Sequence, residues 1–203
     1  MVGLDNTDLF NGTEFTDLFL NTNGTFRYLD GFDYAKGSIV YMDQYYVDVL
    51  LKYDAFEDNL LTKSNDNLSI FDVKLIPEFV SEFTLHHRHF VRMTDFGNNE
   101  FFELAFEGNT IDLYIKHKKK KREKALKSGV QYSFKPINFY LFKYEGEYIK
   151  IESINDLRRE LPDVKDQIKD FHHTYKTLYK EDRDGFMTKL AGYLDKLPEM
   201  DKP

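Results

Sequence analysis

Three neighbouring histidines are the first residues in this sequence that could bind a metal ion. His86, His87 and His89 fall within four positions, and in an extended strand His87 and His89 would share a face. Neutral imidazoles bind zinc or copper, and His172 and His173 could complete a set if a C-terminal helix folded back over the strand. A metal-dependent hydrolase that uses these histidines is therefore an alternative function. The alternative is that the strand ends or bulges here and the histidines are exposed turn residues.

A run of basic residues could bind anions. Residues 116–127 contain eight Lys or Arg and one acid, Glu123. The candidate binding residues in this run are Lys118, Lys119, Lys120, Lys121 and Arg122. Such a patch suits anionic lipid headgroups, lipopolysaccharide or an acidic protein. The alternative is a solvated loop between two strands, and only Ala125 and Leu126 interrupt the run, so we expect no hydrophobic anchor inside it.

The charge of the chain is distributed unevenly. The net charge is −7, from 28 basic and 35 acidic residues. Without residues 116–127 the chain keeps 20 basic and 34 acidic residues, so the run is near +7 and the remainder near −14. A generally acidic body argues against broad nucleic-acid binding, which depends on phosphate neutralisation. We therefore expect a protein or an anionic envelope component as partner, and no nucleic acid.

An aromatic cluster near residue 140 is a second candidate binding surface. Alternation would place Tyr140, Phe142 and Tyr144 on one strand face, opposite Phe139 and Leu141. If that face were exposed, it would form a platform for a sugar, a peptide or a partner. The alternative is that the C-terminal helices cover it.

The sequence does not indicate a particular reaction. The acid pairs Asp54/Asp58 and Glu103/Glu107 could suggest glycosidase chemistry, which needs two facing carboxylates about 5 to 9.5 Å apart, but alternating acids are more typical of the solvent side of a sheet. The chain has no cysteine, which excludes disulfides and thiolate sites. We find no phosphate-binding loop and no nucleophile motif. We therefore predict no catalytic residues and no cofactor.

Hydrophobic periodicity predicts antiparallel strands in the middle of the chain. Residues 45–51 alternate, with Tyr45, Val47, Val49 and Leu51 on one face. Residues 102–106 and 111–115 flank a Gly108-Asn109 turn, which places Phe102, Leu104 and Phe106 in one row. Residues 138–144 and 147–151 repeat this arrangement around Glu145-Gly146, and a further strand is expected over 68–74 after a turn at 64–67.

The last fifty residues change to a helical period. Ser153 and Asp156 can cap a first helix, which Pro162 ends. A second helix should begin at Asp163 and a third after Asp182. The expected fold class is α+β: an antiparallel β-meander of about seven to nine strands, curled into a partial barrel or a sandwich, with two or three C-terminal helices. We expect one structural domain, with a loop-rich arm over 1–36, a β region over 37–151 and a helical segment packed on the sheet over 152–203.

The sequence has no segment that we expect to cross a membrane. No apolar stretch approaches the roughly 20 residues that a spanning helix needs. Residues 1–10 lack the basic and apolar regions of a signal peptide, so the chain as written carries no export signal. Nothing in it predicts an oligomeric state.

Several segments together resemble an uncharacterised family of proteins exported by Bacteroidetes bacteria. Lys36 to Val40 leads into Val47 to Asp58, which is similar to the family's Gly-initiated strand and a following strand that ends in Tyr-Asn/Asp-x-x-x-Asp. Phe139 to Phe142, Tyr148 to Ile151 and Asp156 to Asp163 look like its closing strands and helical tail. The resemblance covers most residues from Gly37 onward.

The chain departs from that family at both ends. The family's Gly-Ser-Pro-Tyr-Leu segment corresponds here to Asn11 to Phe15, and its Tyr-Tyr-Asn-Ser-Leu ending to Gly192 to Leu197. The resemblance implies a location in the periplasm or cell envelope, and carries no chemistry. The expected function is a non-enzymatic envelope binding or accessory protein, with a metal-dependent hydrolase and a structural subunit of an outer-membrane assembly as alternatives.

Overall fold

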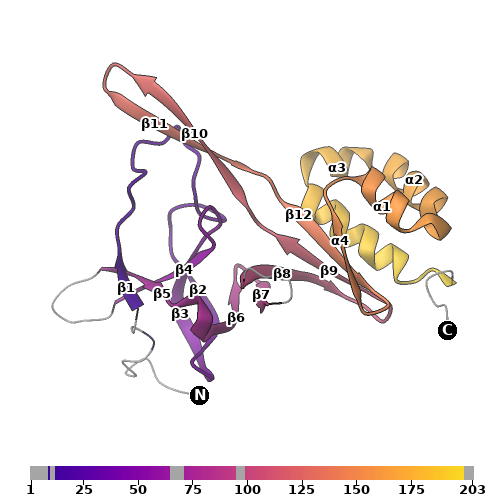
Figure 1. The fold of residues 1–203 in the computed structure, drawn as a ribbon, viewed down its shortest axis with the longest axis horizontal. Coiled ribbons are helices and arrows are strands. Elements are labelled where there is room, and N and C mark those ends of the chain that lie inside the picture. The colour runs from indigo at the N-terminus through magenta and orange to yellow at the C-terminus, as the bar shows by residue number, and fades with distance from the viewer. Residues whose placement is uncertain (1–8, 10–11, 65–70, 95–98, 199–203) are drawn as a thin grey trace. The chain divides into compact units, whose positions relative to one another are not determined.

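The computed structural model describes residues 9, 12–64, 71–94 and 99–198 of the chain (Figure 1). Most of the predicted turn at 64–67 and the first residues of the strand predicted over 68–74 lie outside the described residues. The strands are β1 (Gly12–Phe15), β2 (Ala35–Tyr41), β3 (Gln44–Asp54), β4 (Asn59–Lys63), β5 (Asp72–Leu75), β6 (Val80–Leu85), β7 (Arg88–Met93), β8 (Glu100–Glu107), β9 (Ile111–Lys116), β10 (Lys119–Leu126), β11 (Gly129–Pro136), β12 (Phe139–Tyr144) and β13 (Glu147–Ile151). The helices are α1 (Ile154–Glu160), α2 (Lys165–Thr174), α3 (Lys176–Glu181) and α4 (Arg183–Leu194), with short 3-10 turns at Pro77–Phe79 and Pro162–Val164.

The predicted α+β class, an antiparallel sheet followed by C-terminal helices, is confirmed. Eleven strands are hydrogen-bonded in the order β1-β5-β4-β3-β2-β6-β7-β8-β9-β12-β13, and β10 and β11 form a separate two-stranded sheet. The large sheet is open, so the predicted curling does not close it into a barrel. It has more strands than the seven to nine expected.

The chain divides into two compact units, and the division does not follow residues 36 and 151. Unit 1 comprises residues 1–102 and 117–137, and unit 2 comprises residues 103–116 and 138–203. The predicted N-terminal arm therefore belongs with the strands that follow it. The helical segment forms one unit with β9, β12 and β13.

Aromatic residues on β3, β6, β7 and β8 pack together in the core of unit 1. Phe83 stacks on Phe90 with ring centroids 4.6 Å apart, and Tyr53 packs against both rings. Phe101 contacts Phe83 edge-on at 5.4 Å. Large flat side chains of this kind fill the space beside a pleated sheet, which explains the high Phe and Tyr content.

A bulge interrupts the alternation of side chains that was predicted for β3. Asp48 has a φ of 56°, and the ladder between β2 and β3 shifts register between Gly37 and Ile39. Asp tolerates this left-handed conformation better than most residues because its short side chain can bond locally. As a result Tyr46 is buried and Tyr45 is exposed. The prediction that Tyr45 shares one strand face with Val49 is wrong.

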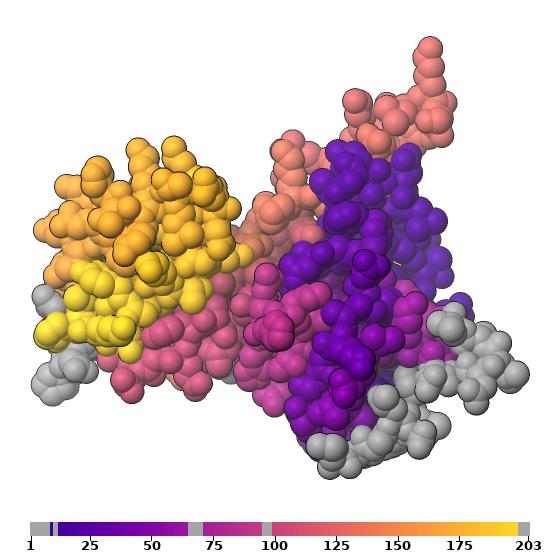
Figure 2. All heavy atoms as spheres, turned by 180° about the vertical axis from the view of Figure 1, so that it is seen from behind, coloured from indigo at the N-terminus to yellow at the C-terminus, as the bar shows by residue number. Residues whose placement is uncertain are grey.

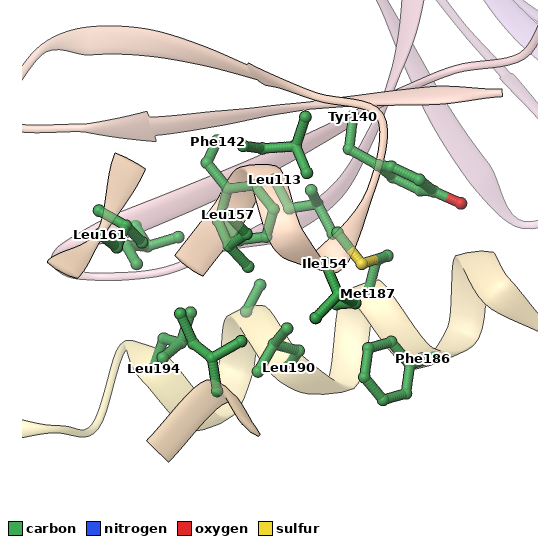
Figure 3. Close-up of a cluster of buried hydrophobic side chains, with 14 of the residues drawn as sticks. Leu113, Tyr140, Phe142, Ile154, Leu157, Leu161, Phe186, Met187, Leu190 and Leu194 are labelled. Carbon is green, nitrogen blue, oxygen red and sulfur yellow. The ribbon is translucent and has the colours of Figure 1, made fainter. Parts of the chain in front are cut away.

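The core of unit 2 lies between the helices and one face of β9, β12 and β13 (Figure 3). Leu113 and Phe142 from the strands point toward Leu157 on α1 and Leu190 on α4, and all four side chains are fully buried. Removing such side chains from water is the main favourable term in folding. The short helices, marginal alone in water, are stabilised by this burial.

A second bulge lies in β8. The β8–β9 ladder shifts register between Leu104 and Phe106, so that Leu104 pairs with Tyr114 and Phe106 pairs with Leu113. Leu113 faces the helices, whereas Tyr114 lies on the other side of the strand. Phe106 therefore packs on unit 2's core and Leu104 does not share its face. The single row predicted for Phe102, Leu104 and Phe106 is wrong because the extra residue reverses the alternation.

Polar capping residues begin two of the four helices where the sequence predicts. The Ser153 hydroxyl accepts a hydrogen bond from the Asp156 amide at 3.2 Å and begins α1. Pro162 follows directly after α1 ends. The Asp182 carboxylate accepts from the Gly185 amide at 2.9 Å and begins α4. The helix predicted from Asp163 begins at Lys165, after a single 3-10 turn.

Candidate binding surface

The basic run forms a β-hairpin. In β10 and β11 of unit 1, Lys119 pairs with Pro136 at one end and Leu126 with Gly129 at the other, and Figure 1 shows them as a long two-stranded ribbon. The alternative of a solvated loop is therefore wrong. Because alternate side chains of a strand point to opposite sides, the hairpin sorts the basic residues into two faces.

Lys119 is on the face that contacts the rest of unit 1. Its Nζ donates to the carbonyl oxygens of Phe26 at 2.8 Å and Leu29 at 3.3 Å, and to that of Tyr28. Burial lowers the pKa of Lys119 to about 8, although the carboxylates of Asp30 and Asp54 act in the opposite direction. Lys119 thus holds residues 26–29 against the hairpin, although we predicted it as a binding residue.

Lys121 has a similar internal role. Its Nζ lies 4.5 Å from the ring centroid of Phe19 and 5.5 Å from that of Tyr132, and it forms an ion pair with Glu123 at 2.9 Å. Phe19 in turn packs on Tyr132 with centroids 4.9 Å apart. Around Lys119 and Lys121, this side of the hairpin is therefore occupied by the N-terminal segment.

The opposite side of the hairpin carries exposed cations. We call this set the cationic face: it comprises Lys120, Arg122, Lys124 and Lys135. All four side chains are exposed, and none forms an ion pair with any carboxylate in the described part of the chain. Residues two apart on a strand lie about 6.8 Å from each other, so the three cations of β10 form an evenly spaced row. Of the predicted residues, Lys120 and Arg122 belong to this face.

Lys118 is the one predicted binding residue of the run that remains. Lys118 is exposed just before β10, where its carbonyl accepts from the Ile137 amide at 2.7 Å. Sequence reasoning missed Lys135 because it lies outside the basic run. Apolar and polar residues alternate from Val130 to Lys135, which is the signal of a strand. Pairing of this strand with the basic run brings Lys135 opposite Lys120.

A buried ion-pair network, which the sequence did not predict, lies behind the hairpin. Arg27 is 3% exposed and its Nη2 lies 2.5 Å from an oxygen of Asp54, which is fully buried. Asp17 at 3.4 Å and Glu57 at 2.9 Å complete the set. Burial alone would lower the pKa of Arg27, but these carboxylates outweigh it and raise the pKa. Asp54 is thus a structural residue.

Asp58, which the sequence analysis paired with Asp54 as possible catalytic acids, also has structural partners. Its carboxylate accepts hydrogen bonds from the Tyr53 hydroxyl and, at 3.2 Å, from the Phe101 amide. Both donors belong to the aromatic core of unit 1. The geometry gives no support to a glycosidase-type pair at Asp54 and Asp58.

The histidines do not share a strand face. His86 and His87 have φ values of 52° and 62° and form the turn between β6 and β7, so the prediction that His87 lies on a strand beside His89 is wrong. His89, on β7, lies 3.1 Å from Glu82. His172 and His173 are on α2, in unit 2. Within the residues that the structure describes, no three His, Cys, Asp or Glu residues are grouped to hold a metal ion.

The aromatic residues of β12 are not an exposed platform. Tyr140 and Phe142 are fully buried in the core of unit 2 (Figure 3). Tyr144 is half-buried against this core. The helices cover this face, so the prediction of an aromatic binding surface is wrong for Tyr140 and Phe142. The Tyr140 hydroxyl donates to the Asp184 carboxylate at 2.7 Å, and both burial and that carboxylate raise the pKa of Tyr140.

The chain matches no protein-family model, no curated protein and no solved structure. Over the residues that are described, none of the helices has the length and apolar character that crossing a bilayer requires. The geometry of the hairpin is therefore the main basis for assigning a function.

Proposed function

We propose that this protein is a non-enzymatic cell-envelope binding or accessory protein that captures an anionic partner through the cationic face. The observation that carries the proposal is the set of four exposed cations with no carboxylate partner among the described residues, in a chain whose net charge is −7. Because acidic residues outnumber basic residues in the chain, we would expect many exposed cations to have a carboxylate nearby. The envelope location rests on the family resemblance.

Protection of a sheet edge does not account for the cationic face. Exposed lysines are a common device to keep edge strands from pairing with other chains. Lys135, however, is on β11, whose outer edge is already covered: the Tyr132 amide donates to Asn21 at 2.8 Å and the Phe134 amide donates to Thr25 at 2.8 Å. A binding role explains the cations on both strands.

The test is retention of the full chain on immobilised heparin, a soluble polyanion, in a rising salt gradient. The variant replaces the four residues of the cationic face with Gln. The control variant replaces four exposed lysines on the helices, Lys165, Lys169, Lys176 and Lys180, and changes the net charge equally. We expect the wild type and the control to be retained and the cationic-face variant to elute at low salt, with its melting temperature nearly unchanged. Equal elution of the two variants, or a wild type that is not retained, would refute the proposal.

A further inference from the structure

We infer that the anionic partner is the surface of a lipid bilayer, and that apolar side chains on the end of the hairpin and on the N-terminal segment beside it insert between the lipid headgroups. This inference rests on the proposed function and specifies its ligand. We call these side chains the apolar set: Leu18, Leu20, Leu126 and Val130. They were not expected to act as an anchor, because the basic run itself contains only Ala125 and Leu126.

Leu18 and Leu20 are the most exposed large hydrophobic residues in the described part of the chain, at 75% and 77%. Their exposure follows from a fixed local structure. Phe19, between them, is turned inward against Tyr132 and Phe134 at 4.9 and 5.8 Å. The neighbouring positions follow the same pattern, because Asp17 and Phe19 are partly buried whereas Leu18 and Leu20 are exposed.

The segment that carries these leucines is held firmly beside the hairpin. The Asp17 carboxylate accepts from the Phe19 amide at 2.9 Å and from the Tyr28 hydroxyl at 2.7 Å. Asn21 donates through Nδ2 to the Val130 carbonyl at 2.8 Å. Leu20 therefore lies one residue from a side chain that is bonded to the end of β11.

The end of the hairpin adds two further apolar side chains. Leu126 shares the face of Lys124 and is 38% exposed, whereas Val130 is on the opposite face and is 43% exposed. The turn between them contains Lys127, so both apolar side chains lie at the end of the hairpin. Figures 1 and 2 both show the end of the hairpin extending beyond the N-terminal segment beside it. From Lys124 to Val130 the sequence contains no acid. The end of the hairpin thus presents apolar groups and cations together without a repelling carboxylate.

This combination fits a membrane surface better than a soluble polyanion. Apolar side chains gain by leaving water for the boundary between headgroups and acyl chains, while Lys and Arg are attracted to anionic headgroups. A soluble anion gives no reason to keep leucines in water. The residues of β11 opposite Arg122 and Lys124 are Ser133 and Gln131, so the cationic face offers no aromatic ring for base stacking.

The first experiment measures co-sedimentation of the full chain with vesicles of phosphatidylcholine alone or mixed with phosphatidylglycerol. We expect binding to the anionic vesicles only, weakened at least about tenfold when the four cationic-face residues become Gln. The double variants Leu18→Ser with Leu20→Ser, and Leu126→Ser with Val130→Ser, should each weaken it about fivefold or more. The control Met42→Ser with Leu50→Ser changes two exposed apolar residues elsewhere in unit 1 and should bind normally.

A second experiment detects insertion directly. The chain contains no tryptophan, so Leu126→Trp introduces a single fluorescent reporter at the hairpin end, and Leu50→Trp on β3 serves as its control. Anionic vesicles should shift the emission of the first to shorter wavelength and leave the second unchanged.

The outcomes separate this inference from the proposed function. Retention on heparin without binding to anionic vesicles would leave the proposed function standing and overturn the inference. The inference would also be overturned if both serine double variants bound vesicles as strongly as the wild type and the emission of Leu126→Trp did not shift. The contact with the membrane would then be electrostatic alone. Self-association in the absence of lipid that the serine variants abolish would identify a second copy of the chain as the occupant of the apolar set and refute the inference.

Discussion

Lys120 lies directly opposite Lys135 in the β10–β11 ladder. Like charges in facing positions of an antiparallel pair destabilise it, whereas opposite charges stabilise it by about 0.2–1 kcal/mol. A sequence selected for stability alone would not keep two exposed lysines in these positions. The pair is the kind of local conflict that functional surfaces retain.

Replacing Lys135 with Glu should therefore stabilise the protein and weaken its function. We expect the free energy of unfolding to rise by about 0.5 kcal/mol, because a facing Lys–Glu pair replaces a repulsive pair. Retention on heparin should fall at the same time. Urea denaturation and the salt gradient measure the two effects. The variant Lys169→Glu, which makes the same change of charge on α2, should leave retention unaltered, and a parallel loss there would show that only net charge matters.

Replacing Arg27 with Met should destabilise unit 1 strongly. The substitution keeps an apolar stem beside Phe19, which lies 5.0 Å from the guanidinium, but leaves the fully buried Asp54 without its cation. Breaking a buried pair in this way costs about 3–5 kcal/mol. Urea denaturation monitored by tyrosine fluorescence measures the loss.

Two further variants separate the buried pair from general effects of losing a charge. The exposed pair of Lys36 and Asp48, at 3.7 Å, is the matched control, and Lys36→Met should cost less than about 1 kcal/mol. Adding Asp54→Asn to Arg27→Met should recover part of the stability, because the uncompensated carboxylate is removed. Similar losses for Lys36→Met and Arg27→Met would contradict a special role of the buried pair.

The titration of Lys119 should make stability depend on pH in the alkaline range. Its pKa is about 8 in the folded protein and near 10.5 when exposed, so between these values the unfolded chain binds more protons than the folded chain. Stability contributed through this group therefore rises with pH across that window. In Lys119→Met this rise should be missing. The measurement is the difference in unfolding free energy between wild type and variant at several pH values, and a constant difference from pH 8 to 10 would refute the assignment. Lys36→Met, on a side chain that is 71% exposed, should not alter the profile.

Periodicity and turn chemistry predicted the hairpins and helix boundaries because these signals are local. Gly146, with a φ of 80°, follows Glu145 in the turn between β12 and β13, where only a left-handed pair joins two such strands closely. Ser153 likewise begins α1 because its hydroxyl reaches an amide three residues away. Neither feature depends on residues distant in the sequence.

The sequence did not predict which residues of β3 and β8 share a face, because a single bulge in each strand reverses the alternation of side chains. Asp48 and the register shift after Leu104 each move the following side chains to the other side of the sheet, and neither position has a composition that marks it. The candidate site shows the same limit. The basic run was visible, but the pairing with β11 decided that Lys119 is internal and that Lys135 joins the cationic face.

The hydrogen bond between Tyr140 and Asp184 gives a prediction for unit 2. Tyr140→Phe removes the hydroxyl that donates to Asp184 at 2.7 Å, although Asn138 still donates to the same carboxylate at 2.9 Å. A hydrogen bond to a charged group contributes about 1.5–3 kcal/mol, so we expect a loss of about 2 kcal/mol at neutral pH. The four α-helices found among the described residues all belong to unit 2, so urea denaturation followed by helical circular dichroism reports on this unit.

The pKa of Tyr140 gives this variant a second signature. Because the pKa is raised in the folded protein, the unfolded chain loses its proton first as the pH rises above the ordinary value of 10, and the stability that depends on the protonated hydroxyl falls. The gap between wild type and Tyr140→Phe should therefore narrow above pH 10. Tyr193→Phe is the matched control, because the Tyr193 ring stacks on Phe171 and its hydroxyl has no hydrogen bond within the described residues. If the difference in unfolding free energy between wild type and Tyr193→Phe narrowed above pH 10 as much as that for Tyr140→Phe, the hydrogen bond to Asp184 would not be the cause.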